Sequence, residues 1–156
     1  MGLDNGFICK NIKRDEIPSY VRLPWDCRDE DIEIAYFRKC WGIRGEIIRL
    51  LHVKDDEYKI PVEKEDIIPI VKILMKYLDR EYYDENADSI WEYDEYKENI
   101  QHSIINFMWL RVYMETHPDV TCYFYDSYWC VGKKNICTTI SIQLKYSEVH
   151  YIINVQ

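Results

Sequence analysis

The chain has 156 residues, of which 47% are hydrophobic and 31% charged, and its formal net charge is −8. A chain of this length can bury a core without help from metals or disulfides, so we expect residues 1–156 to form a single domain. The negative charge argues against direct binding to nucleic acid, and no run of about 20 apolar residues suggests a membrane span. The first residues lack the basic and apolar regions of a signal peptide, so we expect a cytoplasmic protein.

Apolar side chains change their spacing along the chain, and these changes predict the secondary structure. Alternation with a period of two predicts strands, and spacings of three and four predict helices. Pro69 fits the first turn of a helix that begins near Asp66, an expected N-cap, because its missing N–H needs no helical partner there. The expected elements are strands over residues 5–10, 32–36 and 58–62, helices over 40–52, 66–78 and 95–116, and strands over 120–131, 136–146 and 149–155.

The order of these elements predicts the fold class. Strands and helices are mixed, and the last third of the chain is rich in aromatic and β-branched residues. We therefore expect an α+β fold, with an antiparallel or mixed β-sheet covered by about three α-helices and extended by C-terminal strands. The inward face of the last helix should carry Ile100, Ile104, Phe107, Met108 and Val112.

The six cysteines and four histidines do not form a recognisable site. In a reducing cytoplasm we expect buried thiols rather than disulfides. No Cys-x-x-Cys or His-x-x-x-His spacing occurs, so no metal is expected. The chain also lacks a nucleophile elbow and a glycine-rich phosphate loop. We therefore expect no cofactor and no catalytic residue, and the sequence favours binding over catalysis.

The least ordinary feature is an acidic tract over residues 79–98, in which nine carboxylates face two cations. Aromatic residues are interleaved with the acids. One interpretation is a solvated loop that keeps the protein soluble. The other is a surface that docks on a basic protein, with the aromatic rings as anchors. The candidate partner-binding residues are Asp84, Glu85, Asp88, Trp91, Glu92, Tyr93, Asp94, Glu95 and Tyr96.

Five segments, in this order, carry a family resemblance: Met1–Asp4, Glu33–Lys39, Glu57–Ile60, Tyr93–Tyr96 and Val120–Trp129. They resemble the small bacterial and phage proteins whose N-terminus typically begins Met-Gly-Leu-Asp-Met-Tyr-Leu, although this chain departs from that opening after its fourth residue. The resemblance implies a protein of phages, prophages or other mobile elements. It implies no activity and no catalytic residues, because none is established for the family.

Three hypotheses follow. The first is a mobile-element accessory protein that binds a basic host protein, such as an anti-CRISPR inhibitor of a nucleic-acid-handling defence protein. The second is a small-ligand-binding protein or minor enzyme, in which Asp4, Arg38 and Lys39 join the 94–96 box in a polar pocket. These residues could equally form ion pairs and cap the strand–helix junction. The third is a structural homo-oligomer that pairs through its C-terminal strands.

Overall fold

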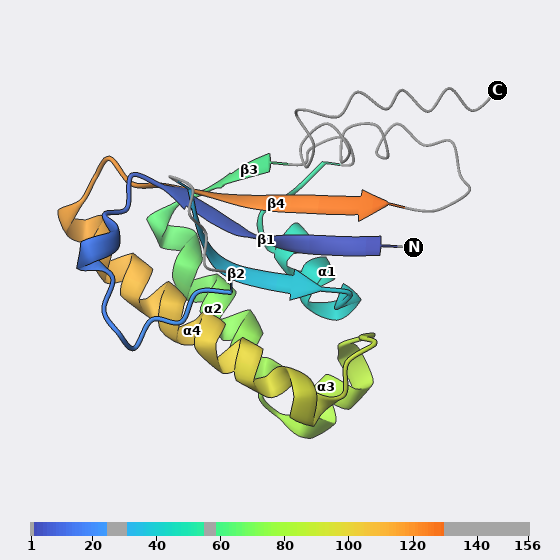
Figure 1. The fold of residues 1–156 in the computed structure, drawn as a ribbon. Helices are drawn as coiled ribbons and strands as arrows, with labels where there is room; N and C mark the ends of the chain where they lie inside the picture. The colour runs from blue at the N-terminus through green and yellow to red at the C-terminus, as the bar shows by residue number, and fades with distance from the viewer. Residues whose placement is uncertain (1, 25–30, 55–58, 130–156) are drawn as a thin grey trace, which may run out of the picture.

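The computed structural model describes residues 2–24, 31–54 and 59–129 (Figure 1). The expected strands over 136–146 and 149–155 lie outside the described residues, as do Cys27, Cys130 and Cys137. Short 3-10 turns occur at Arg14–Glu16 and Lys64–Asp66. The main elements are β1 (Gly2–Lys10), β2 (Ile32–Arg38), α1 (Trp41–Leu50), β3 (Lys59–Val62), α2 (Ile67–Lys76), α3 (Arg80–Asn86), α4 (Tyr93–Thr116) and β4 (Thr121–Trp129).

The four strands form one antiparallel sheet in the order β2-β1-β4-β3 (Figure 1). β1 and β4 pair along their whole length, from Gly2 opposite Trp129 to Lys10 opposite Thr121. Phe7 of β1 faces the helices, and its ring meets that of Phe107 on α4 edge to face, with 4.8 Å between centroids. The predicted α+β class is confirmed, and the sheet is purely antiparallel.

The inward face of α4 differs from the expected one. Met108 and Val112 are 41% and 58% exposed, whereas the fully or nearly fully buried positions include two polar residues, Ser103 and Asn106. The Asn106 amide donates to the carbonyl oxygens of Arg22 and Ile34, at 2.7 and 2.9 Å, and accepts the Arg22 N–H at 3.1 Å. Because Asn106 satisfies backbone groups of the edge strand β2 and of the loop that contains Arg22, the buried face of the helix differs from the one expected from apolar spacing alone.

The start of α2 also differs in detail. Asp66 lies at the N-cap position of α2, as predicted, but its side chain makes no capping bond to that helix. The Asp66 side chain instead forms a capping box with Glu63 around the preceding 3-10 turn, Lys64–Asp66. In it the Glu63 N–H donates to the Asp66 carboxylate at 2.9 Å. Pro69 lies in the first turn of α2, as predicted.

The described cysteines are buried free thiols, as expected. Cys9, Cys40 and Cys122 all lie in the core. Burial raises the pKa of Cys9 well above its usual value, and a hydrogen bond with Cys122 adds to the effect. Burial raises the pKa of Cys40 to about 11. In the described part of the chain, no cluster of side chains suits a metal ion, and no helix has the length and apolarity to cross a bilayer.

Candidate functional site

The acidic tract folds as a helix, a turn and the start of a second helix. Asp79 caps α3, because its side chain accepts the Tyr82 N–H at 2.8 Å. The side chain of Arg80, the first residue of α3, reaches Asp84 on the same helix at 3.9 Å and Asp94 on α4 at 3.3 Å. The tract is therefore a folded part of the molecule, in which most of the carboxylates lie on α3 and the first turns of α4, while Asp88 and Glu92 lie in the turn between them.

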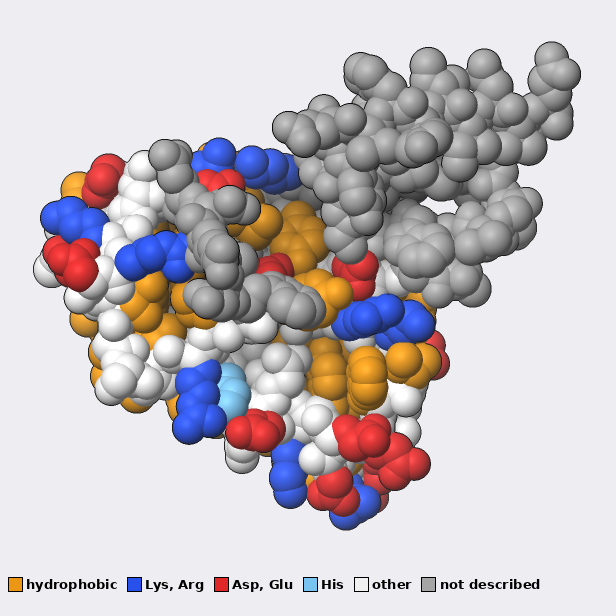
Figure 2. All heavy atoms as spheres, viewed as in Figure 1, with side chains coloured by type: hydrophobic (Ala, Val, Ile, Leu, Met, Phe, Trp, Pro, Cys, Tyr) orange, Lys and Arg blue, Asp and Glu red, His pale blue; other side chains and the backbone are white. Residues whose placement is uncertain are grey.

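Figure 2 shows acidic side chains gathered at the end of the molecule where α3 and the start of α4 lie. The nine carboxylates of the tract fall into three groups according to the contacts that each one makes. Helix caps use Asp79, Glu92 and Glu95. Ion pairs with described cations or histidine use Asp84, Asp94 and Glu98. No described cation lies within ion-pair distance of Glu81, Glu85 and Asp88. These three charges are the ones available to a partner without breaking a local contact.

Most of the aromatic rings of the tract fasten it to the core. Tyr83 is buried and donates to the Trp91 carbonyl oxygen at 2.8 Å. Tyr93 donates to the Leu78 carbonyl oxygen at 2.5 Å. Tyr96 is only 6% exposed, and burial raises its pKa well above the usual value. Tyr96 therefore belongs to the core, which corrects its inclusion among the partner-binding residues.

Two exposed apolar residues remain in the tract, Ile90 at 61% and Trp91 at 37%. They lie where residues 87–92 run beside residues 38–42, at the junction of β2 and α1. We call this pair of segments the corner. Trp91 lay among the candidate residues from the sequence, but Ile90 did not, although an isoleucine within so acidic a stretch was the available signal.

The corner is held by hydrogen bonds to main-chain carbonyl oxygens, from one side chain and from main-chain N–H groups. The indole N–H of Trp91 donates to the Arg38 carbonyl oxygen at 3.1 Å. The N–H of Gly42 donates to the Ala87 carbonyl oxygen at 2.8 Å. This close approach depends on Gly42, because a Cβ there would lie 2.0 Å from a backbone oxygen of the facing turn. The backbone that carries Ile90 and Trp91 is therefore fixed before any partner arrives.

Each of the two segments of the corner contains a residue whose backbone adopts the left-handed (positive φ) conformation. Lys39 has a φ of 51° and Asp88 a φ of 43°. Such conformations cost non-glycine residues about 1 kcal/mol or more, and they persist only where surrounding contacts enforce them. Here the contacts are the bridge between Cys40 and Ser89 and the bond from the Ile90 N–H to the Lys39 carbonyl oxygen, at 3.4 Å.

The expected polar pocket is only partly assembled. Arg38 lies 3.9 Å from Asp4, and the Tyr36 hydroxyl donates to the same carboxylate at 2.6 Å. Burial, followed by this hydrogen bond, raises the pKa of Tyr36. Lys39 belongs to the corner. The 94–96 box does not join them: Asp94 pairs with Arg80 and Lys97, Glu95 caps α4, and Tyr96 is in the core.

A hollow of about 410 Å³ lies elsewhere, between α4 and residues 22–24. Its polar side chains already contact one another. Glu98 lies 3.7 Å from both Arg22 and His102, and Asn106 is engaged with backbone as described above. The hollow therefore presents satisfied groups, and it does not point to a particular ligand.

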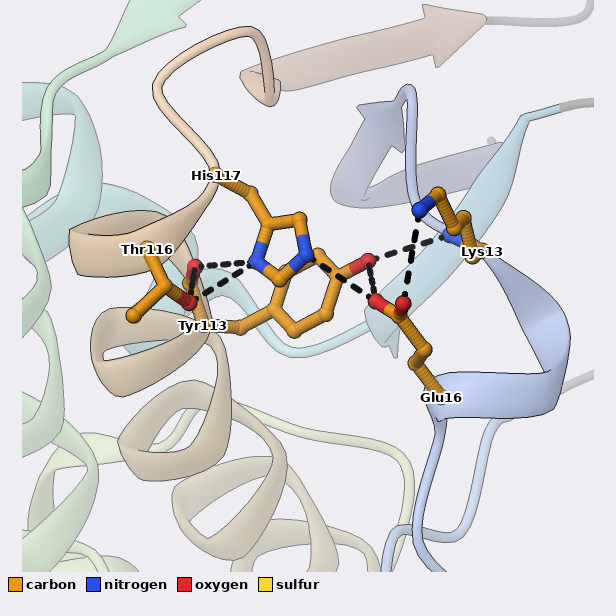
Figure 3. Close-up of polar contacts among 5 residues, drawn as sticks. All are labelled: Lys13, Glu16, Tyr113, Thr116 and His117. Carbon is orange, nitrogen blue, oxygen red and sulfur yellow. Dashed lines mark hydrogen bonds and ion pairs between the residues drawn. The ribbon is translucent and has the colours of Figure 1, made fainter.

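A second polar cluster, which sequence reasoning missed, joins the loop after β1 to the end of α4 (Figure 3). The His117 ring stacks on Tyr113 with 3.8 Å between centroids. Its Nε2 lies 3.0 Å from the Glu16 carboxylate, which also accepts the Tyr113 hydroxyl at 2.6 Å. The other ring nitrogen contacts Thr116 and the Tyr113 carbonyl oxygen, in the last turn of the helix. The cluster therefore serves as a clamp between loop and helix.

Comparisons with known proteins find no relative of this chain. No model of a protein family matches it, no curated protein matches it, and no solved structure matches its fold. The resemblance to the phage-type family therefore stays a prediction, and the functional argument depends on the geometry of the corner and of the acidic tract.

Proposed function

We propose that the protein acts by binding a basic protein partner through the acidic end of the molecule, with Ile90 and Trp91 as anchors. In this proposal it is an accessory protein of a phage or other mobile element, and it inhibits a host defence protein by occupying a surface that normally handles nucleic acid. The partner is then basic because it binds phosphate, and the carboxylates of α3 compete for that surface.

The observation that carries the proposal is an exposed aromatic residue on a fixed backbone. Tryptophan is enriched among residues that dominate binding energies, and a fixed backbone lowers the entropy lost on binding. Ile90 adds apolar area next to it. The carboxylates of Glu85 and Asp88 lie on the same tract and have no described cation within ion-pair distance, so a partner's lysines or arginines can approach them without displacing a local ion pair.

The test is capture followed by titration. The tagged full chain would capture proteins from a bacterial lysate at low and at high salt, and mass spectrometry would identify a stoichiometric partner. The purified partner would then be titrated with the wild type and with Trp91→Ala. We expect Trp91→Ala to weaken binding by about 30-fold, which corresponds to about 2 kcal/mol for a central anchor. Trp91→Phe keeps most of the ring area and should retain most of the affinity.

The charge contribution needs its own variant and control. Reversing two charges in Glu85→Lys/Asp88→Lys should weaken binding and reduce its dependence on salt. Glu65→Lys, an exposed acid outside the tract, serves as the matched control and should leave the affinity unchanged. Equal affinity for the wild type, Trp91→Ala and the double charge reversal would refute the proposed surface.

A further inference from the structure

The solvent-exposed face of α4 carries a regularly spaced row of residues that do not pack into the core. The helix has 24 residues. Along its exposed side, six exposed residues follow one another at alternating spacings of three and four. We call this row the seam, and it consists of Glu98, Gln101, Ile105, Met108, Val112 and Glu115. Alternating spacings of three and four describe the contact line of one helix in a coiled coil.

The seam is apolar in its middle and acidic at both ends. Ile105, Met108 and Val112 form the middle and are 41%, 41% and 58% exposed. Glu98 and Glu115 lie beyond them on the same line. Glu98 also lies 3.7 Å from Arg22 and His102, but the Arg22 and Glu98 side chains are both exposed, and an exposed ion pair gives way to a partner's cation at little cost. Single exposed apolar residues are ordinary on protein surfaces, whereas three on one line of one helix form an apolar stripe against which another helix can pack. The distribution of charge then decides which kind of helix can occupy it.

A second copy of this chain fits the seam poorly. In an antiparallel pair that places Ile105 of each copy opposite Met108 of the other, Glu98 lies opposite Glu115. In a parallel pair each glutamate lies opposite itself. Moving the antiparallel pair by one heptad removes this clash but places Glu98 opposite Met108 in one direction and Glu115 opposite Ile105 in the other. Each of these registers therefore sets like charges together or an acid against an apolar side chain, and both destabilise a helix pair.

We propose that the seam of α4 binds an amphipathic helix of another protein, with an apolar centre and a lysine or arginine at each end of its contact line. Such a helix places a cation against each terminal glutamate and apolar residues against the middle of the seam. This contact site is separate from the corner, so it holds or fails independently of the function proposed above.

The test uses a defined probe. A labelled synthetic helix of about three heptads would carry leucine at the three central seam positions and lysine at both ends. A matched peptide would carry glutamate at the ends. Binding to the full-length protein would be followed by fluorescence anisotropy. We expect the lysine peptide to bind at least tenfold more tightly than the glutamate peptide, in the wild type and equally in Trp91→Ala.

Met108→Glu separates seam binding from general attraction between opposite charges. The substitution adds a negative charge, so general attraction would strengthen binding of the lysine peptide, whereas the seam predicts at least a tenfold loss. Met75→Glu makes the same change at an exposed methionine of α2 and should not weaken binding. The proposal is overturned if the two peptides bind alike, if neither binds, or if Met108→Glu leaves the affinity unchanged. A dimer of the wild type that Met108→Glu dissolves would overturn it too, because a second copy would then be the occupant.

Discussion

The two glycines of α1 give a matched pair of substitutions that tests the geometry of the corner. At Gly42 an added Cβ would lie 2.0 Å from the Asn86 carbonyl oxygen and 2.9 Å from the Cα of Ala87. At Gly45 no atom lies within 4 Å of the added Cβ. Alanine should therefore destabilise the protein at the first position and stabilise it at the second, although both lie in one helix.

The expected magnitudes follow from these contacts. Relief of the clash at Gly42 requires a backbone shift of about 1 Å, and overpacking of this kind costs about 1–3 kcal/mol. The shift also stretches the hydrogen bonds to the Ala87 and Asp88 carbonyl oxygens, which are 2.8 and 3.3 Å long, and each contributes about 1 kcal/mol. Gly42→Ala should thus lower the free energy of unfolding by about 3 kcal/mol. Gly45→Ala should raise it by about 1 kcal/mol through helix propensity.

Urea unfolding followed by circular dichroism measures both changes. In thermal melts, a chain of this size should show a midpoint about 10 °C lower for Gly42→Ala and about 3 °C higher for Gly45→Ala. The wild type and Gly45→Ala serve as controls for folding and for helix content. If Gly42→Ala were as stable as the wild type, the close approach of α1 to the turn after α3 would be wrong, and with it the fixed backbone on which the proposed function depends.

Three other outcomes are expected. Asn5→Leu should raise the free energy of unfolding by about 1 kcal/mol, because the Asn5 amide is fully buried and has no hydrogen-bond partner among the described residues; a lower melting temperature would contradict this. Burial raises the pKa of Glu46, but hydrogen bonds from Lys76, Tyr82 and Tyr77 outweigh it, so the pKa lies below its usual value. Glu46→Gln should therefore cost about 2 kcal/mol near pH 7, and the difference from the wild type should vanish in urea titrations as the pH falls through the lowered pKa. Native Cys40, with its pKa near 11, should react with iodoacetamide at pH 8 far more slowly than the unfolded chain, as peptide mass spectrometry would show.

Spacing of apolar residues was sufficient to predict the four described strands and three of the four described helices. It did not predict α3, because that helix lies in the acidic tract and has no apolar face of its own. The helical spacing in α2 reflects one buried face, so sequence and structure agree there. In β2 the apolar alternation marked the strand, although Glu33 and Ala35 on the other face are buried as well. The α4 face was misassigned because Ser103 and Asn106 are polar and Met108 is apolar. Which face of that helix is buried depends on hydrogen bonds to β2 and the loop before it, and these depend on tertiary contacts that spacing does not encode.

The candidate site, too, was predicted where local sequence patterns decide it and missed where contacts between distant segments decide it. The sequence identified the acidic tract and Trp91, because charge and aromatic content are visible without a fold. It missed that residues 87–92 lie against residues 38–42, about 50 positions earlier. It missed the clamp of Glu16, Tyr113 and His117 for the same reason, since two of its members are separated by 97 positions. Contacts between distant segments arise from the topology, which local patterns do not determine.

The sheet order has a consequence for how the chain reaches its folded state. β1 is a central strand, and its partner β4 begins 111 residues after the last residue of β1, at Thr121. During synthesis, the backbone groups along one edge of β1 therefore lack their partner strand until almost all of the described chain has emerged from the ribosome. Pairing so remote in sequence slows folding and makes it depend on late events. We therefore expect nascent chains that stop before Thr121 to engage chaperones, and the sheet to close in a single late step.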